Sequence, residues 1–299
     1  MKQKNMVKGY IFVIASAFIF GCMPLGAKLI YAEGVNSISL VFLRNGMAIP
    51  VLALLAKSQG HSLRISRGAF REISAIAVMG CCVTPVLLFS SYRYLTSGTA
   101  TVFHFVYPAV VVVGGIVFLR ERALKKDLFC VLICTVGICL FYDPGQPIDL
   151  RGGALALLSG VTYASYILLL SRFRHKEIAG FKFSFYIAVI CSAVMLIVCL
   201  ASGKMALPVS LRGWALCLVF SLSLSVGAVV LFQQGTFLIG GQRAAILSTV
   251  EPITSIFAGV LVFQETLSLR TTVGSVLVVM ASILIAVFDM RSSKQVAAG

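Results

Sequence analysis

The stretch "ILSTVEPITSIFAG", residues 246–259, places a carboxylate and a proline side by side inside an apolar segment. Glu251 is the only charge in the twenty residues from 244 to 263. An ionised side chain at the centre of a bilayer costs about 2.5–3.5 kcal/mol, and Pro252 lacks the N–H that a helix uses. We therefore expect this face to border a polar cavity, where the Ser248 carbonyl, left without its helical donor, meets water or substrate.

The composition of the whole chain indicates a membrane protein. Of its 299 residues 59% are hydrophobic and 12% are charged, and the mean hydropathy is +1.01. Soluble domains are about 45–50% apolar and about 25% charged. The net charge of +15 would suit nucleic acid, but the basic residues lie in short clusters between apolar runs. We expect no nucleic-acid partner.

The first apolar run, residues 9–29, is too long for the core of a cleaved signal peptide and is expected to be an uncleaved membrane helix. The nine cysteines all lie in apolar runs without a C-x-x-C pair, so we interpret them as packing residues. Nucleotide-binding, zinc-binding and nucleophile motifs are absent from the sequence. We therefore expect no catalytic site, no metal and no cofactor, and neither an enzyme nor an ATP-driven pump.

The hydropathy pattern predicts an all-α integral membrane protein with ten transmembrane helices. If the N-terminus is inside, eighteen Lys and Arg residues fall on the cytoplasmic side and five on the other. This asymmetry predicts a multi-pass protein of the cell membrane with both termini cytoplasmic. The predicted spans are 9–30, 36–56, 72–92, 97–119, 126–142, 152–171, 183–202, 213–238, 243–263 and 270–288.

The two halves of the sequence are related at an offset of 143 residues, which becomes 144 after one inserted residue. The pattern divides the chain into a first repeat (1–142), a connecting loop (143–150) and a second repeat with a short tail (151–299). Because each repeat holds five helices, the second is inverted, as is typical of secondary transporters with a site near the midplane. Matched pairs include Phe89 with Phe232, Gly98 with Gly241, Pro108 with Pro252 and Glu121 with Glu265, and "KGY" (8–10) aligns with "RGG" (151–153).

Three stretches carry a resemblance to a known family: "YPAVVVVGGIVFLRE" (107–121), "EPITSIFAGVLVFQE" (251–265) and "FLRNGMA" (42–48). They resemble the drug/metabolite transporter superfamily, in its EamA-type ten-helix branch. The resemblance implies a five-plus-five inverted repeat, a central cavity lined largely by helices 1, 3, 4, 6, 8 and 9, and export of amino acids or small metabolites. His104 and Tyr107 do not belong to the shared motif.

Glu251 is the leading candidate for substrate binding or proton coupling, and Ser248 shares its helix face. The alternative is a structural ion pair between Glu251 and Arg44. Arg44 is also a candidate for binding a substrate carboxylate. Pro108 and Pro252 are expected to bend their helices.

His104 and Tyr107 occupy the repeat positions of Ser248 and Glu251. The histidine suits proton coupling, or it makes a hydrogen bond between helices. Gln233 requires polar partners within its span. The further candidates are aromatic side chains that suit apolar or cationic ligands, or simple packing: Tyr163, Phe20 and Phe89.

These features predict a secondary active transporter that exports amino acids or related small metabolites by alternating access. The alternatives are a facilitative uniporter or channel on the same fold, and a carrier of organic cations such as quaternary amines. Arg44 with Gln233 favours a zwitterion or carboxylate, whereas Glu251 with tyrosines favours a cation. Expected partners are a small-molecule substrate and the lipid bilayer, with protons as a further candidate, for a monomer or a homodimer.

Overall fold

The structure is a computed structural model. It describes residues 2–60, 62–95, 97–120, 125–140, 149–175, 178, 180–254, 257, 268–270, 272–281 and 283–284. Glu121, Glu265 and most of the predicted connecting loop lie outside the described residues.

Regular structure in the described part of the chain is helical throughout, and no strand occurs there. Residues 251–254 and 272–281 are also helical. The labelled α-helices are α1 (Lys2–Gly21), α2 (Met23–Ala32), α3 (Ser37–Gly46), α4 (Ile49–Ser58), α5 (Arg67–Ala77), α6 (Thr84–Ser91), α7 (Ser97–His104), α8 (Tyr107–Leu119), α9 (Lys125–Cys139), α10 (Leu150–Ser171), α11 (Phe181–Ser202), α12 (Leu211–Ser221), α13 (Val229–Ile239) and α14 (Gly241–Leu247). Two π-helices, η1 (Val78–Val83) and η3 (Leu222–Ala228), and one 3-10 helix, η4 (Ser248–Val250), complete the set.

Seven helical stretches are long and apolar enough to cross a membrane, and each corresponds to a predicted span. The other three predicted spans, 126–142, 243–263 and 270–288, extend beyond the described residues. Shorter apolar helices, Leu128–Cys139 and Thr272–Ala281, lie within two of them. The seven long stretches are Asn5–Ala32, Ser37–Ser58, Arg67–Ser91, Thr99–Leu119, Leu150–Ser171, Phe181–Ser202 and Leu211–Ile239.

Several spans are built from two or three helical segments, and a proline accounts for the position of five of the junctions between segments. A proline has no N–H that could donate a hydrogen bond to the preceding turn of a helix, but it is well accommodated in the first turn of a helix. Prolines therefore stand at the first or second position of the segment that follows each of these junctions: Pro24 in α2, Pro50 in α4, Pro85 in α6, Pro108 in α8 and Pro252 in the turn after η4.

The expectation that Pro252 leaves the Ser248 carbonyl free is wrong. The backbone tightens into the 3-10 turn η4, and the Glu251 N–H donates to the Ser248 carbonyl. A 3-10 turn pairs residues three apart instead of four, so the Glu251 amide replaces the donor that Pro252 lacks. The junction is polar because of the Glu251 carboxylate and not because of an unpaired carbonyl.

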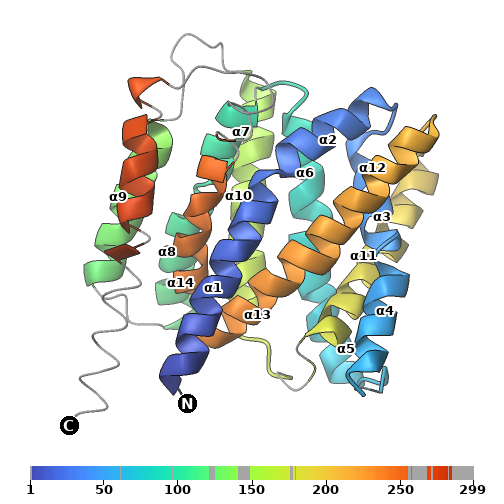
Figure 1. Ribbon diagram of the computed structural model, residues 1–299, viewed down its shortest axis with the longest axis horizontal. Helices are drawn as coiled ribbons and strands as arrows, with labels where there is room; N and C mark the ends of the chain where they lie inside the picture. Colours follow the sequence, from blue (N-terminus) through green and yellow to red (C-terminus); the bar gives the residue numbers. More distant parts are fainter. Residues whose placement is uncertain are drawn as a thin grey trace.

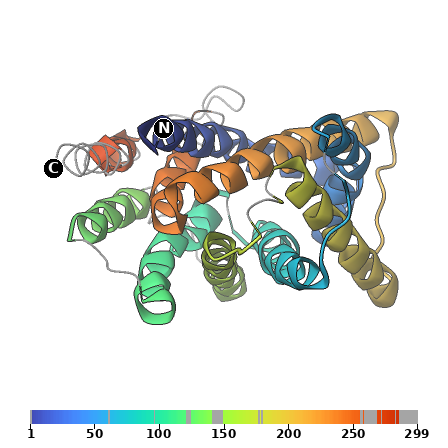
Figure 2. The ribbon, with the colours of Figure 1, turned by 90° about the horizontal axis from the view of Figure 1, so that it is seen from below.

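The helices form one bundle in which α1 packs along α13 and α10 packs along α6 (Figures 1 and 2). A methyl group added at Gly9 would lie 2.9 Å from Leu238 Cβ, and one added at Gly152 would lie 2.7 Å from Leu95 Cγ. Gly9 aligns with Gly152 and Leu238 with Leu95 at the offset of 143 residues. The same close contact between a glycine and a leucine thus occurs twice between the two halves, each time with the glycine from one half and the leucine from the other.

Other local features recur at matching positions of the two halves. The π-helices η1 and η3 begin at residues 78 and 222, within one residue of the offset of 143 that applies to this part of the sequence. Ser16 donates to the Val13 carbonyl over 2.7 Å, and Ser159 donates to the Ala156 carbonyl over 2.6 Å. These coincidences extend the sequence relation between the halves to backbone conformation.

Hydrogen bonds tie together connectors that the charge pattern assigns to the same side. At one end, Lys182 Nζ donates to the Arg64 carbonyl over 2.8 Å. At the other, Asn36 Nδ2 donates to the Lys204 carbonyl over 2.6 Å. The N-terminal end of α1 and the connector between α4 and α5 lie at the same end of the bundle (Figure 1).

Candidate functional site

A small cavity of about 50 Å³ lies at the centre of the bundle. Its volume suffices for a few water molecules, whereas sites for small ligands usually measure about 300–1,000 Å³. In this conformation the cavity is therefore too small for a metabolite, which would enter only after the helices move apart. Its lining residues are Phe20, Met23, Arg44, Gly80, Cys81, Thr84, Pro85, Leu88, His104, Tyr163, Tyr166, Val229 and Glu251.

Glu251 enters the cavity from the first helical turn after η4 and is partly exposed there. Gly21 of α1 allows the close approach, because a methyl group at Gly21 would lie 2.7 Å from the Glu251 carbonyl oxygen. Tyr92, Tyr107 and Tyr163 are near enough to interact with the Glu251 charge. Within the described residues no cation forms an ion pair with this carboxylate.

Arg44 reaches the same cavity from α3. Only 3% of Arg44 is exposed, and its Nε has no hydrogen-bond partner. Its nearest electrostatic neighbours are thiols and a phenol, those of Cys81, Cys191 and Tyr166 among them. A buried guanidinium without a compensating anion is costly. Such a group favours a ligand that brings its own negative charge.

The structure does not join Arg44 and Glu251. Both side chains line one cavity, but no ion pair between them exists in this part of the described chain. A structural salt bridge between these two residues, one of the two interpretations left open by the sequence, is therefore not present in this conformation.

Aromatic rings form one wall of the site. The rings of Tyr163 and Tyr107 meet edge to face with centroids 4.8 Å apart, and the His104 ring lies 5.5 Å from that of Tyr163. Tyr166 stacks on Tyr163 at 5.5 Å, and Phe232 lies 5.9 Å from Tyr163. Such rings offer apolar area and negative faces that attract cations.

His104 ends α7 and is held by α10. Its Nδ1 lies 2.8 Å from Ser159 Oγ, and the ring is buried. α10 approaches closely because Gly160 has no side chain: a methyl group there would lie 2.4 Å from the His104 carbonyl oxygen. The contact fixes the histidine at the edge of the cavity.

Five of the nine candidate binding residues line the cavity, namely Phe20, Arg44, His104, Tyr163 and Glu251. The other four lie behind its wall. Tyr107 contacts the His104 and Tyr163 rings, and Ser248 donates to the Ala244 carbonyl over 2.8 Å. Phe89 is fully buried beside Phe220.

Gln233 finds its partners inside the protein. Its Oε1 accepts a 2.6 Å hydrogen bond from Ser184, and its Nε2 lies 3.4 Å from the Tyr166 hydroxyl. Gln233 therefore orients a lining residue and does not itself line the cavity. The prediction that a glutamine in a span needs polar partners is met by α11 and α10.

Three polar or reactive lining residues were not among the candidates: Cys81, Thr84 and Tyr166. Thr84 precedes Pro85 in the same way that Glu251 precedes Pro252, so a polar residue before a proline within a span was a usable signal. Thr84 is hydrogen-bonded to Thr162 over 2.8 Å.

A methyl group at Gly80 would lie 2.1 Å from the Tyr166 ring, so glycine is required where this ring enters the wall.

Among the described residues, six of the seven apolar helical stretches and the turn after η4 contribute side chains to this cavity. The chain belongs to the EamA-like transporter family, which matches residues 7–142 and 150–287. It is a multi-span membrane protein, and its class implies a small-molecule substrate and a lipid environment.

Relatives of this chain are also named as transporters. The uncharacterized transporter YcbK of Bacillus subtilis (strain 168) is 25% identical over 288 residues, which cover 91% of each chain. The uncharacterized inner membrane transporter YicL of Salmonella typhimurium is 23% identical and covers 96% of this chain and 98% of its own. A solved crystal structure shares the fold with a TM-score of 0.72 at 16% identity, over 95% of this chain and 98% of the other.

Proposed function

We propose that this protein is a secondary transporter that exports amino acids or related zwitterionic metabolites across the cell membrane by alternating access. The observation that carries the proposal is the pair of unjoined opposite charges in one central cavity. Arg44 suits a substrate carboxylate because a guanidinium binds carboxylates through two parallel hydrogen bonds. Glu251 suits a substrate ammonium group, and the aromatic wall accommodates a side chain of modest size.

Alternating access requires two conformations of comparable energy, which two inverted five-helix repeats provide. Three observations support such repeats. The family matches the chain twice, over residues 7–142 and 150–287. The contacts of Gly9 and Gly152 correspond, and so do the π-helices η1 and η3. The ten-helix architecture and the boundaries 1–142, 143–150 and 151–299 are part of this proposal.

The small cavity fits an occluded intermediate between outward-open and inward-open forms. Helices that open it must bend or tilt, and junctions at proline are natural places for this. His104 and Pro108 stand at one junction, and Glu251 and Pro252 stand at the equivalent one. Movement at these two junctions would widen the cavity between α7 and the turn after η4.

A carrier of organic cations, such as quaternary amines, is a second candidate function. The aromatic wall of Tyr163, Tyr166 and His104 beside the Glu251 carboxylate favours it. In that case Arg44 would lack a role in binding, and substitution of Arg44 would leave cation transport intact. A channel on this fold would retain the cavity but would show neither saturation nor counterflow. A facilitative uniporter would show both, but a proton gradient would not drive it to accumulate substrate.

The energy source and topology of the proposed carrier follow from its charges. Glu251 and His104 are the cavity residues able to take up and release protons, so a proton gradient is the proposed driving force. Both termini are proposed to be cytoplasmic, from the positive-inside pattern. The proposal holds for a monomer or a homodimer, since each protomer contains a complete cavity.

Proteoliposomes containing the purified protein test the proposal. Uptake of labelled neutral amino acids and of labelled choline would be measured with and without a proton gradient. Saturable transport of amino acids that Arg44→Gln abolishes supports the zwitterion proposal. Transport of choline alone, insensitive to Arg44→Gln, would replace it with the organic-cation function.

A further inference from the structure

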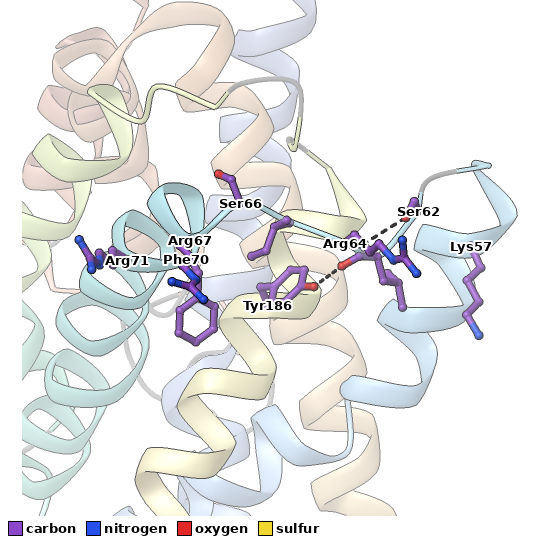
Figure 3. A pocket seen from close by; sticks show the side chains of 10 residues that line it. Lys57, Ser62, Arg64, Ser66, Arg67, Phe70, Arg71 and Tyr186 are labelled. Atoms are coloured by element: carbon purple, nitrogen blue, oxygen red, sulfur yellow. Dashed lines mark hydrogen bonds between the residues drawn. The ribbon is translucent and has the colours of Figure 1, made fainter.

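A second pocket of about 950 Å³ lies at the end of the bundle, where α4 ends and α5 begins. It is open to the surroundings and is separate from the central cavity, since the two share no lining residue. Four cationic side chains line it: Lys57, Arg64, Arg67 and Arg71. Figure 3 shows Arg67 and Arg71 on α5 and, across the pocket, Arg64 and Lys57.

Among the residues that the structure describes, no acidic side chain neutralises the positive charge of this pocket. None of its lining residues is acidic. All four cations are exposed, and none forms an ion pair with a described residue. Like charges held together repel one another, so the arrangement favours a polyanionic or phosphate-bearing ligand that neutralises several cations at once.

Contacts with α11 help to shape the pocket, together with the connector between α4 and α5. The Tyr186 hydroxyl donates to the Leu63 carbonyl, and Lys182 Nζ donates to the Arg64 carbonyl over 2.8 Å. Ser66 caps α5 by accepting a 3.1 Å hydrogen bond from the Ala69 N–H. The backbone that carries Arg64 and Arg67 is therefore fixed before any ligand arrives.

We propose that this pocket binds the phosphodiester headgroup of an anionic phospholipid, such as phosphatidylglycerol or cardiolipin. The position favours a lipid over a soluble anion, because the pocket joins the ends of two membrane-crossing helices. Phe70 lines it and is 47% exposed, so it offers an apolar contact beside the cations. Basic pockets between transmembrane helices recognise anionic lipid headgroups in this way.

The test uses the full-length protein in detergent and native mass spectrometry of bound lipid. Dioleoyl-phosphatidylglycerol is titrated against the wild type, and dioleoyl-phosphatidylethanolamine serves as the zwitterionic lipid. Inorganic phosphate at millimolar concentration is the competing soluble anion. The triple variant Arg64→Gln, Arg67→Gln, Arg71→Gln is compared with a charge-matched control, Arg151→Gln, Lys204→Gln, Arg270→Gln, whose exposed cations lie outside the pocket.

Each cation near an anionic lipid contributes roughly a fivefold change in affinity, so the triple variant is expected to bind phosphatidylglycerol on the order of a hundredfold more weakly. The control variant is expected to bind as the wild type does, and phosphate is expected not to displace the lipid. Equal binding of both lipids, unchanged binding by the triple variant, or displacement by phosphate would each overturn the proposal. Should the triple variant fail to fold, the three single variants carry the test, each with an expected loss of roughly fivefold.

Discussion

Arg44 and Glu251 line the same central cavity from two different spans, and within the described residues no ion pair joins them. Arg44 is 3% exposed and its Nε lacks a hydrogen-bond partner, whereas Glu251 is partly exposed to the cavity. Leaving the buried Arg44 guanidinium without an anionic partner costs free energy that a salt bridge would recover in part. Under the proposed function, a zwitterionic ligand would compensate both charges.

Substitution of Glu251→Gln is expected to reduce amino-acid flux about tenfold or more, because a hydrogen bond to a charged group contributes about 1.5–3 kcal/mol. The amide keeps the shape of the side chain, so the melting temperature in detergent is expected to change little. The matched control is Glu33→Gln, which alters a carboxylate that accepts from Ser210 at the end of the bundle. Wild-type flux in the Glu251→Gln protein would remove this residue from the mechanism.

Substitution of Gly80→Ala is expected to damage the site sterically. The new methyl group would stand 2.1 Å from the Tyr166 ring, and such overpacking costs about 1–3 kcal/mol. Both flux and melting temperature are expected to fall. Gly227→Ala is the control, because its methyl group would meet Ile19 at an ordinary 3.5 Å. Equal flux and equal melting temperature in the two alanine variants would contradict a close contact between Gly80 and the Tyr166 ring.

The hydrogen bond between His104 and Ser159 is expected to couple α7 to α10. A double-mutant cycle of His104→Ala and Ser159→Ala should give an interaction energy of about 0.6 kcal/mol and at most about 1.7 kcal/mol, as for other hydrogen bonds between membrane helices. The free energies of unfolding of the wild type, the two single variants and the double variant are measured with the purified proteins in mixed micelles. If the effects of the two substitutions on the free energy of unfolding are strictly additive, the hydrogen bond contributes nothing to stability.

The orientation of the bundle can be tested with single cysteines. A membrane-impermeant maleimide is expected to label Lys204→Cys in intact cells and Ser62→Cys only after permeabilisation, because the charge pattern places the two connectors on opposite sides. The single cysteines are introduced into a variant that carries Cys22→Ser and Cys139→Ser, since these two are the exposed native thiols among the described residues. The reverse labelling pattern would invert the proposed topology.

The sequence predicted the membrane class, seven of the spans now described as helices, and the location of Glu251 in a cavity. These features follow from patterns that are local in the chain, such as apolar length and a charge beside a proline. The 3-10 turn at Ser248 was missed because the pattern shows only that a donor is absent, and not that the Glu251 N–H replaces it.

The sequence did not indicate that Tyr166, and not Gln233, lines the cavity. The two side chains lie on different helices, 3.4 Å apart, and only the packing of α10 against α13 determines which of them lines the cavity. Helical spacing indicates the residues that share a face. It does not indicate which of these residues a neighbouring helix covers and which remain in contact with the cavity.

Counterflow in proteoliposomes tests the central claim most directly. Vesicles loaded with an unlabelled neutral amino acid are expected to accumulate the labelled form transiently, and both Arg44→Gln and Glu251→Gln are expected to abolish this accumulation. Counterflow requires a site that alternates between the two sides while occupied, and loss in both variants requires that the site use both charges. Counterflow that persists at the wild-type rate in both variants would contradict the account.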